Sequence, residues 1–376
     1  MRRLLIPALF LCLLLSLPAS AGRWGFDPGA LPEAPTEEDF AVFQVGSAAR
    51  TWGFIDQDFS AKDLRALSPS FLARQSFDAA TRWPGSDRLP AGFTPRDWLE
   101  LGKDPGLGLR DLHREGVTGA GVTVAIIDKP IRSTHRELAG RLTYLQVYGE
   151  VTEGLDFHFH GQACASILAG ETVGVAPGVE VIYLATPDLG RNFEFYSHAA
   201  MRLIAVNARL PEDSKIRLVS ISDGLGRDNP HQADWTKARE ALAKEGIEVV
   251  YSDLGVLSGL TWGGALPWSD RAEPSSYAIA RFLADRGVEP GEVILPGDYR
   301  TTASNSGDDA YTWWGDGGYS WAIPYAAGLA ALAWQIAPDL KLAQIEGALI
   351  STSVAAGDGS KVVQPKAFIE RVRELK

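Results

Sequence analysis

Cysteine is scarce in this chain, with two residues, Cys12 and Cys164, among 376. Cys12 lies in an apolar amino-terminal stretch that we expect to be removed, which would leave Cys164 without an intramolecular partner. A framework of disulfides is therefore excluded. Hydrophobic residues make up 45% of the sequence, which is enough for a chain of this length to bury a full core.

Long apolar runs are also scarce, and the clearest lies in residues 1–21, MRRLLIPALFLCLLLSLPASA. Two arginines, an apolar centre and the exit Ala19-Ser20-Ala21 are typical of a secretory signal peptide. The apolar part is shorter than the ~20 residues that span a bilayer. We therefore expect an exported protein, secreted or periplasmic, that does not stay on the membrane after cleavage.

Clusters of Lys and Arg are missing, and the formal net charge is −11 with a pI near 5.1. Binding to phosphate groups needs clustered basic side chains. Nucleic acid and anionic membrane surfaces are therefore excluded as partners. We also find no internal repeat and no low-complexity tract, and we expect a monomer.

The amino-terminal part differs in character from the rest. Residues 22–89 are irregular and rich in Pro, Trp and acidic residues, with one strand-like run at 40–45. We interpret them as a leader, either a removable propeptide or a permanent accessory segment; their tryptophans and length slightly favour the propeptide. The stretch TPRDWLEL then predicts a helix with Thr94 as its cap and Pro95 at its first position, so the main domain would comprise residues 90–376.

Short apolar runs alternate with helical stretches beyond Leu109. Buried strands are predicted for 122–127, 179–185, 216–221 and 247–252, and helices for 161–170, 197–210 and 234–246. This alternation predicts an α/β fold, a doubly wound and mainly parallel sheet with helices on both faces. In such sheets catalytic groups gather beyond the carboxyl ends of the strands.

Three polar residues stand at positions suited to chemistry. Asp128 ends a predicted strand, although an aspartate there is more often a turn or helix cap. His160 precedes a helix of small residues, and Gly161 would allow another segment to approach closely. Ser320 precedes an Ala- and Gly-rich helix with Pro324 in its first turn, so it is either a helix cap or a nucleophile that the helix holds.

Other interpretations of these segments are weaker. His158 and His160 form an HxH pair, but no nearby Cys or carboxylate completes a zinc site. Cys164 lies four residues after His160, on the same helical face, either as a Cys/His dyad or as a small buried thiol. A nucleotide-binding loop at Gly119 and Gly121 fails, because these glycines precede their strand instead of following it.

The order Asp, His, Ser on a parallel α/β sheet is that of subtilisin, whereas α/β-hydrolases run Ser, acid, His. The segments GAGVTVAIID, HGQACASILAG with GVAPG, and GYSWAIPYAAGLAAL resemble the three active-site blocks of the subtilisin-like serine proteases, the subtilases. Supporting matches are THREL, LVSISDG and ILPG. The resemblance covers about Leu109 to Ser353.

The resemblance implies a role for each residue. Ser320 would attack a peptide carbonyl, His160 would take and return its proton, and Asp128 would fix and stabilise the imidazole. The backbone N–H groups at the start of the Ser320 helix would face the developing oxyanion. The strand at Ser222, Asp223 and Gly224 would bind the backbone of the substrate.

The sequence departs from the family pattern at the aspartate block and at the oxyanion position. Lys129 and Pro130 follow Asp128 where the family has Ser or Thr and Gly, so the hydrogen bonds to Asp128 must differ. Asp253 stands where the family has an oxyanion-binding asparagine. If ionised it cannot donate, and the loss of one donor costs about 10²–10³ in rate; if an apolar pocket keeps it protonated, it still donates.

The serine and histidine blocks also carry unusual neighbours, namely Tyr319, Trp321, Gln162 and Ala163, which would reshape the substrate cleft. We therefore expect a secreted serine endopeptidase that acts on peptides or proteins through an acyl-enzyme. The alternative is a catalytically weak or inactive subtilase-fold protein that binds peptides. The sequence assigns no definite cofactor; calcium, which is common in the family, is the candidate, although no compact acidic loop here indicates a site.

Overall fold

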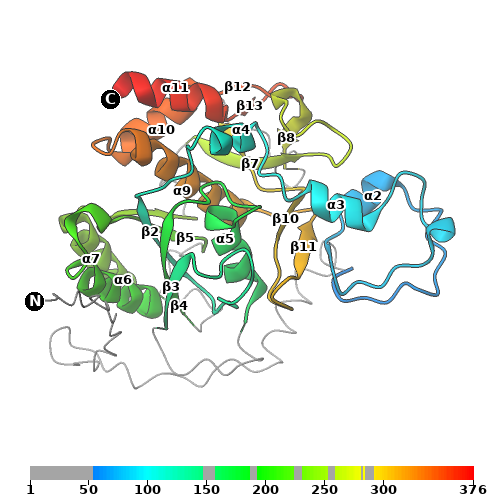
Figure 1. The fold of residues 1–376 in the computed structure, drawn as a ribbon, viewed down its shortest axis with the longest axis horizontal. Coiled ribbons are helices and arrows are strands. Elements are labelled where there is room, and N and C mark those ends of the chain that lie inside the picture. Colours follow the sequence, from blue (N-terminus) through cyan, green and yellow to red (C-terminus); the bar gives the residue numbers. More distant parts are fainter. Residues whose placement is uncertain are drawn as a thin grey trace, which may run out of the picture. The chain divides into compact units, whose positions relative to one another are not determined.

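The computed structural model describes residues 54–146, 157–186, 193–223, 231–252, 259–280, 283 and 292–376 (Figure 1). The predicted signal peptide and the strand-like run at 40–45 lie outside these residues. Within them, no helix combines the length and the hydrophobicity needed to cross a bilayer.

A five-stranded parallel sheet carries the centre of the fold. Its strands lie in the order β3-β4-β2-β5-β6, and each neighbouring pair is parallel. The bounds are β2 Thr123–Asp128, β3 Leu142–Gln146, β4 Glu180–Ala185, β5 Ile216–Ile221 and β6 Glu248–Tyr251. Four of these strands are the four predicted from buried, β-branched runs. Because β2 is central, its last residue, Asp128, comes out at the middle of the carboxyl edge.

Helices cover both faces of this sheet, which confirms the predicted fold class. The side chains of β2 alternate: Ala125 and Ile127 pack with α6 (Phe193–Asn207) and α7 (Gln232–Lys244), while Val124 and Ile126 belong to the core that holds α5 (Phe159–Ala169) and α9 (Tyr319–Ile336). In Figure 1, α6 and α7 lie side by side on one side of β2 and β5. A strand buried on both faces reads as a continuous apolar run.

Two further sheets extend the fold beyond the central one. The first has the order β12-β13-β9-β7-β8, and the second is antiparallel with the order β1-β11-β10, where β1 is Phe77–Asp78. The remaining bounds are α4 Leu109–Arg114, η3 Glu212–Ser214, β7 Leu260–Ala265, η4 Pro274–Ser276, β8 Tyr277–Ile279, β9 Val293–Pro296, β10 Arg300–Ala303, β11 Tyr311–Trp314, α10 Leu342–Ser351, β12 Val354–Ala355, β13 Lys361–Val362 and α11 Pro365–Leu375. The last helices, α10 and α11, pack on α9.

The helix that carries Ser320 begins earlier than the sequence suggested. It starts at Tyr319 with Gly318 at the N-cap, so Ser320 is its second residue and Pro324 its sixth. Gly318 has φ +97° and supplies no side-chain cap. Pro324 therefore lies beyond the first turn, where a missing N–H leaves one carbonyl of the helix without its usual donor.

Residues 54–104 join the antiparallel sheet and share its core. They form α2 (Pro69–Ala73), β1 (Phe77–Asp78), η2 (Ser86–Arg88) and α3 (Pro95–Leu101). Thr94 is at the N-cap of α3, as predicted, although its side chain makes no capping hydrogen bond. Strand β1 pairs with β11, where Phe77 lies opposite Trp313. The removal of residues 22–89 as a propeptide stays a prediction.

Aromatic packing fixes this amino-terminal segment to β11. Trp313 is fully buried, and its Nε1–H donates to the carbonyl of Ala73 at 3.1 Å. Its ring stacks on Phe77 with a centroid distance of 6.2 Å and lies 5.8 Å from the ring of Trp98. Strand β11 leads directly to the loop before Ser320, so the segment supports the strand from which that loop emerges.

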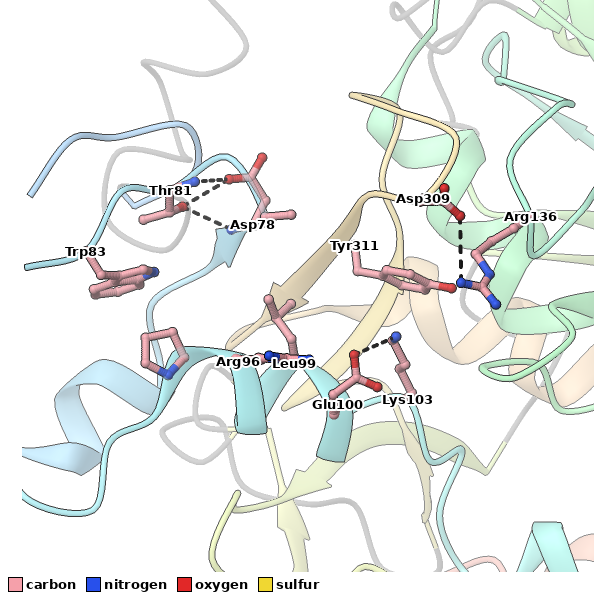
Figure 2. Close-up of a pocket in the computed structure, with 12 residues that line it drawn as sticks. Asp78, Thr81, Trp83, Arg96, Leu99, Glu100, Lys103, Arg136, Asp309 and Tyr311 are labelled. Carbon is pink, nitrogen blue, oxygen red and sulfur yellow. Dashed lines mark hydrogen bonds and ion pairs between the residues drawn. The ribbon is translucent and has the colours of Figure 1, made fainter. Parts of the chain in front are cut away.

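A cavity of about 430 Å³ lies where the amino-terminal segment meets the rest of the fold (Figure 2). Trp83 and Asp78 line it from one side and Tyr311 from the other. Lys103 lies 3.7 Å from the centre of the Tyr311 ring and also pairs with Glu100 at 2.8 Å. The charges in this cavity are thus largely paired within the protein.

We expect Trp313→Ala to lower the free energy of unfolding by about 3–5 kcal/mol, because it empties a buried aromatic site and removes a hydrogen bond. Chemical denaturation followed by circular dichroism measures this. Trp268→Ala is the matched control, since Trp268 is 55% exposed. Equal stability of the two variants would contradict the role assigned to the aromatic cluster.

Candidate active site

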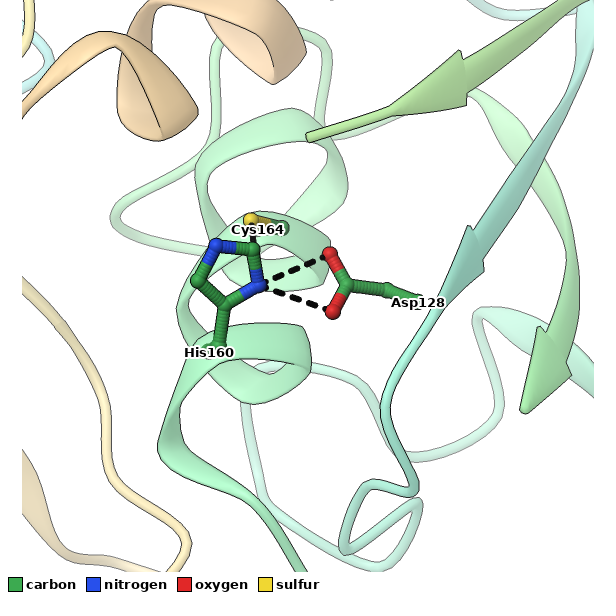
Figure 3. Close-up of side chains that lie close together, drawn as sticks. All are labelled: Asp128, His160 and Cys164. Atoms are coloured by element: carbon green, nitrogen blue, oxygen red, sulfur yellow. Dashed lines mark hydrogen bonds and ion pairs between the residues drawn. The ribbon is translucent and has the colours of Figure 1, made fainter. Parts of the chain in front are cut away.

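Asp128 and His160 form a hydrogen-bonded pair at the carboxyl edge of the central sheet (Figure 3). Asp128 is the last residue of β2 and is 2% exposed. His160 is the second residue of α5, and its Nδ1 lies 2.8 Å from Oδ1 and 3.1 Å from Oδ2 of Asp128. A carboxylate only accepts, so the proton of a neutral imidazole resides on Nδ1 and Nε2 carries a lone pair.

Short backbone bonds tie the two blocks together. The Lys129 N–H donates to Oδ1 of Asp128 at 2.7 Å, and the His158 N–H donates to the carbonyl of Pro130 at 2.8 Å. The hydrogen bonds at Asp128 are therefore supplied in part by the unusual residue that follows it. Gly161 permits the close approach of another segment, as predicted. A Cβ at this position would overlap the carbonyl oxygen of Lys129 and the hydroxyl of Tyr183.

His158 starts the helix of His160. Its Nδ1 accepts the N–H of His160 at 3.1 Å. Burial lowers the pKa of His158 to about 3, helped by the nearby charges of His160 and Lys129, so this imidazole stays neutral and its Nδ1 remains an acceptor. In the described residues the group of close metal-ligand atoms is Asp128, His160 and Cys164, within 4.8 Å of one another, and does not include His158.

The charges of Asp128 and His160 stabilise each other. Burial by itself would raise the pKa of Asp128, but the His160 charge and hydrogen bond, with Lys129, lower it to about 2. Burial would lower the pKa of His160, but the attraction of Asp128 outweighs it and the pKa lies well above 6.5. The site therefore favours an imidazolium backed by a carboxylate, which is the state that a general base reaches after taking a proton.

Of the two interpretations of Cys164, a Cys/His dyad or a small buried thiol, the structure favours the buried thiol. Cys164 is 1% exposed, and burial raises the pKa of its thiol despite the opposing effect of His160, so the neutral form is favoured. Its Sγ lies 3.9 Å from Nδ1 of His160 and 3.6 Å from the carbonyl oxygen of Ser320, to which it donates. That carbonyl lacks its usual helical donor because residue 324 is proline.

Cys164 contacts both His160 and the backbone carbonyl of Ser320, whereas the Ser320 hydroxyl is hydrogen-bonded elsewhere and not to the imidazole. This hydroxyl donates to the carbonyl of Ser222 at 3.1 Å, so it does not cap the helix. Ser222 follows β5, and the contact joins the serine helix to the strand that the resemblance assigns to substrate binding. Gly224 and Asp253, the other predicted substrate and oxyanion positions, lie outside the described residues.

Asp223 is turned toward the interior by two partners. The Tyr196 hydroxyl donates to its Oδ2 at 2.7 Å, and Lys129 Nζ lies 3.4 Å from the same oxygen. Lys129 also donates to the Tyr196 hydroxyl at 3.1 Å, and its side chain is 7% exposed. The cation that follows Asp128 thus links the end of β2 to α6 and to the segment after β5.

The unusual neighbours have definite places around the pair. Trp321 is 2% exposed, and its ring centroid lies 5.4 Å from that of His160. The backbone N–H of Arg132 donates to Oε1 of the buried Gln162 at 2.8 Å. The ring centroids of Tyr319 and Trp262 lie 5.5 Å apart. Bulky aromatic groups therefore occupy positions next to the serine and behind the histidine.

The sequence analysis did not point to two residues that contact the site residues or the loop before Ser320, Tyr196 and Asp298. Tyr196 lies within a helix, and nothing in its spacing marks it as a partner of Lys129. Asp298 follows the Pro-Gly turn at the end of β9 and is 4% exposed. An acidic residue directly after the apolar run VILPG was the available signal.

Comparison with known proteins finds a similarity to one family over part of the chain. The profile described as "Subtilase family" matches residues 119–253, which include Asp128 and His160 and end before Ser320. Over these residues the chain is similar to the subtilases.

Individual subtilases match at modest identity. "Subtilisin-like protease 1" of Pseudogymnoascus destructans is 26% identical over 58% of this chain and 52% of that protein. "Extracellular serine proteinase" of a Thermus species is 27% identical over 74% of this chain and 67% of its own length. The chain spans about half the length of the first and two thirds of the second. The solved "Prenylagaramide maturation protease PagA" aligns with 70% of this chain and 98% of that one, at 19% identity and a TM-score of 0.48.

We expect the stability that Asp128 contributes to depend on pH in one direction. Its folded pKa is about 2, below its ordinary value of 3.8. The stabilisation, about 2 kcal/mol, is therefore present above pH 4 and is lost as the pH falls toward 2. The difference in unfolding free energy between wild type and Asp128→Asn, measured in denaturant from pH 7 to pH 2, should shrink over that window. A constant difference would contradict the assignment; Asp97→Asn, at an exposed position, is the control.

We expect Lys129 and Asp223 to be energetically coupled. Lys129→Met leaves a mostly buried carboxylate without its cation and should lower the unfolding free energy by about 1–3 kcal/mol. Asp223→Asn in the same background should cost less than it does in wild type. A double-mutant cycle measured by chemical denaturation gives the coupling, and strictly additive effects would show that the pair is not a unit.

Proposed function

We propose that this protein is a secreted, subtilase-type serine endopeptidase that hydrolyses peptide bonds through Asp128, His160 and Ser320. The observation that carries the proposal is the Asp128–His160 hydrogen bond, which leaves Nε2 unprotonated in the neutral imidazole while Ser320 lies close by at the start of α9. A nucleophile, a base and a group that orients the base are the parts that acyl transfer needs.

The reaction would proceed in two halves. In the first, the Ser320 hydroxyl leaves the carbonyl of Ser222, its Oγ attacks the peptide carbonyl, and its proton passes to Nε2 of His160. Catalytic hydrogen bonds are often loose in a free enzyme and tighten when substrate binds. The imidazolium, stabilised by Asp128, then protonates the leaving amine. In the second half, water activated by His160 releases the acyl group.

The oxyanion would form at the amino terminus of α9. Gly318 provides no capping side chain, and the Trp321 N–H already donates to the carbonyl of Gly318 at 3.1 Å, so the N–H groups of Tyr319 and Ser320 are those that would face developing negative charge. Asp253 is the proposed second oxyanion residue, and its protonation state would set whether it donates. Calcium binding stays a prediction, with no residues assigned to it.

The substrate would be a peptide or protein that lies along the segment Ser222–Gly224. The charge of Asp223 is balanced by Lys129, so this segment would engage the substrate through its backbone and not by capturing a basic side chain. Export rests on the amino-terminal sequence, MRRLLIPALF followed by an Ala-Ser-Ala exit, and is in keeping with the name of the relative called an extracellular serine proteinase.

The test is labelling with a fluorophosphonate, which reacts with an activated serine. Wild type should be labelled and Ser320→Ala should not, while Ser304→Ala, which removes the hydroxyl of a buried serine, should react like wild type. Labelling should rise with pH, because His160 acts as a base only after losing a proton whose pKa lies well above 6.5.

Absence of labelling at any pH would overturn the proposal and favour a protein that binds peptides without cleaving them. Labelling that persists in Ser320→Ala would show that another residue is the nucleophile. A strong increase in Asp253→Asn would show that an ionised Asp253 limits the rate, by about 10²–10³ if one donor is lost.

A further inference from the structure

We infer that Asp298 is a positioning residue for Ser320: its buried carboxyl group accepts two backbone N–H groups of the loop that leads into the nucleophile and so fixes where that serine stands. The inference rests on the proposed function of Ser320. Asp298 does not contact the reacting atoms; it would act through the loop.

The contacts converge on one oxygen. Oδ1 of Asp298 lies 2.8 Å from the backbone nitrogen of Gly317 and 3.2 Å from that of Gly318. Gly318 is the N-cap of α9, two residues before Ser320. The carboxyl group thus satisfies two N–H groups immediately upstream of the nucleophile, while those of Tyr319 and Ser320 would face the oxyanion.

Asp298 is itself held by the sheet. Its backbone N–H and that of Gly297 both donate to the carbonyl of Gly263 in β7, at 3.0 and 2.8 Å. A Cβ added at Gly264 would lie 2.6 Å from the carbonyl oxygen of Asp298. The backbone of Asp298 is therefore hydrogen-bonded to strand β7, and this fixes the carboxyl group that the loop donates to.

The loop needs such an anchor because of its composition. Gly317 and Gly318 have no side chains to hold them, and glycine has the largest backbone freedom of any residue. A Cβ at Gly317 would overlap the carbonyl oxygen of Gly297, so the close approach itself requires glycine. The carboxyl group of Asp298 therefore restrains a loop that has no side chains of its own at Gly317 and Gly318.

The protonation of Asp298 does not decide whether it can hold the loop. Burial raises its pKa to about 7, the two N–H groups oppose this, and the neighbouring carboxylate of Asp316 adds to it. One carboxyl oxygen accepts hydrogen bonds in either state. Asparagine keeps this acceptor and removes the charge, which makes Asp298→Asn the conservative variant.

The experiment compares four variants of the full chain with wild type. Asp298→Ala and Asp298→Leu remove the acceptor, the latter while filling the volume, and Asp298→Asn retains it. Asp78→Ala is the matched control, because Asp78 is also 4% exposed and its Oδ1 also accepts two backbone N–H groups, those of Asp56 and Thr81. The readouts are the rate of fluorophosphonate modification, the hydrogen exchange of backbone amides in residues 315–322, and unfolding in denaturant.

We expect Asp298→Ala and Asp298→Leu to slow modification on the order of 10²-fold, as a displacement of about 1 Å at a reacting group does, and to speed exchange at Gly317 and Gly318. Asp298→Asn should recover most of the rate. Asp78→Ala should lose stability without losing rate. If Asp298→Ala does not fold, Asp298→Leu carries the comparison.

The inference is overturned if removal of the acceptor leaves both the modification rate and the exchange at Gly317 and Gly318 unchanged, or if Asp298→Asn is as slow as Asp298→Ala. Should wild type itself not be labelled, the proposed function fails, and exchange still decides whether Asp298 holds the loop. Faster exchange in the variants without the acceptor then supports the anchor, and unchanged exchange rejects it.

Discussion

The hydrogen bond between Asp128 and His160 is the constraint on which the site depends. It joins the end of the central strand to the start of α5 across a distance of 2.8 Å, and it assigns the imidazole proton to one nitrogen. Taking a carboxylate out of water is costly unless it is paired. Here the backbone of Lys129 and the imidazole supply the compensation, so the pair is both a folding requirement and the source of a basic nitrogen.

Side chains next to this pair also form hydrogen bonds with backbone groups of the helices that carry His160 and Ser320. His158 starts α5 with its side chain, and Cys164 donates to a carbonyl that Pro324 leaves without a helical partner. Farther out, the aromatic cluster of Phe77, Trp98 and Trp313 ties the amino-terminal segment to β11. That strand leads into the loop that contains Gly317 and Gly318.

Much of the frame could be predicted because its signals are local. Four buried strands and the helices between them follow from apolar runs and periodicity, and a parallel sheet brings Asp128 to a defined edge. The helix start at Ser320 was less predictable. Its N-cap is Gly318, which has a positive φ and no capping side chain, and the neighbouring Gly317 lies too close to the carbonyl oxygen of Gly297 for a side chain, so no capping residue in the sequence marks this start.

Local patterns in the sequence were enough to predict the fold class, the resemblance to the subtilases and the candidate catalytic residues, because strand burial and short motifs depend on neighbouring residues. The contacts that restrain these residues became visible only in the folded chain: Lys129 pairs with Tyr196 and Asp223, Ser320 donates to the carbonyl of Ser222, and Asp298 accepts from the glycine loop. These contacts join segments far apart in the chain. Their partners are selected by the packing of the sheets and helices, which no local pattern encodes.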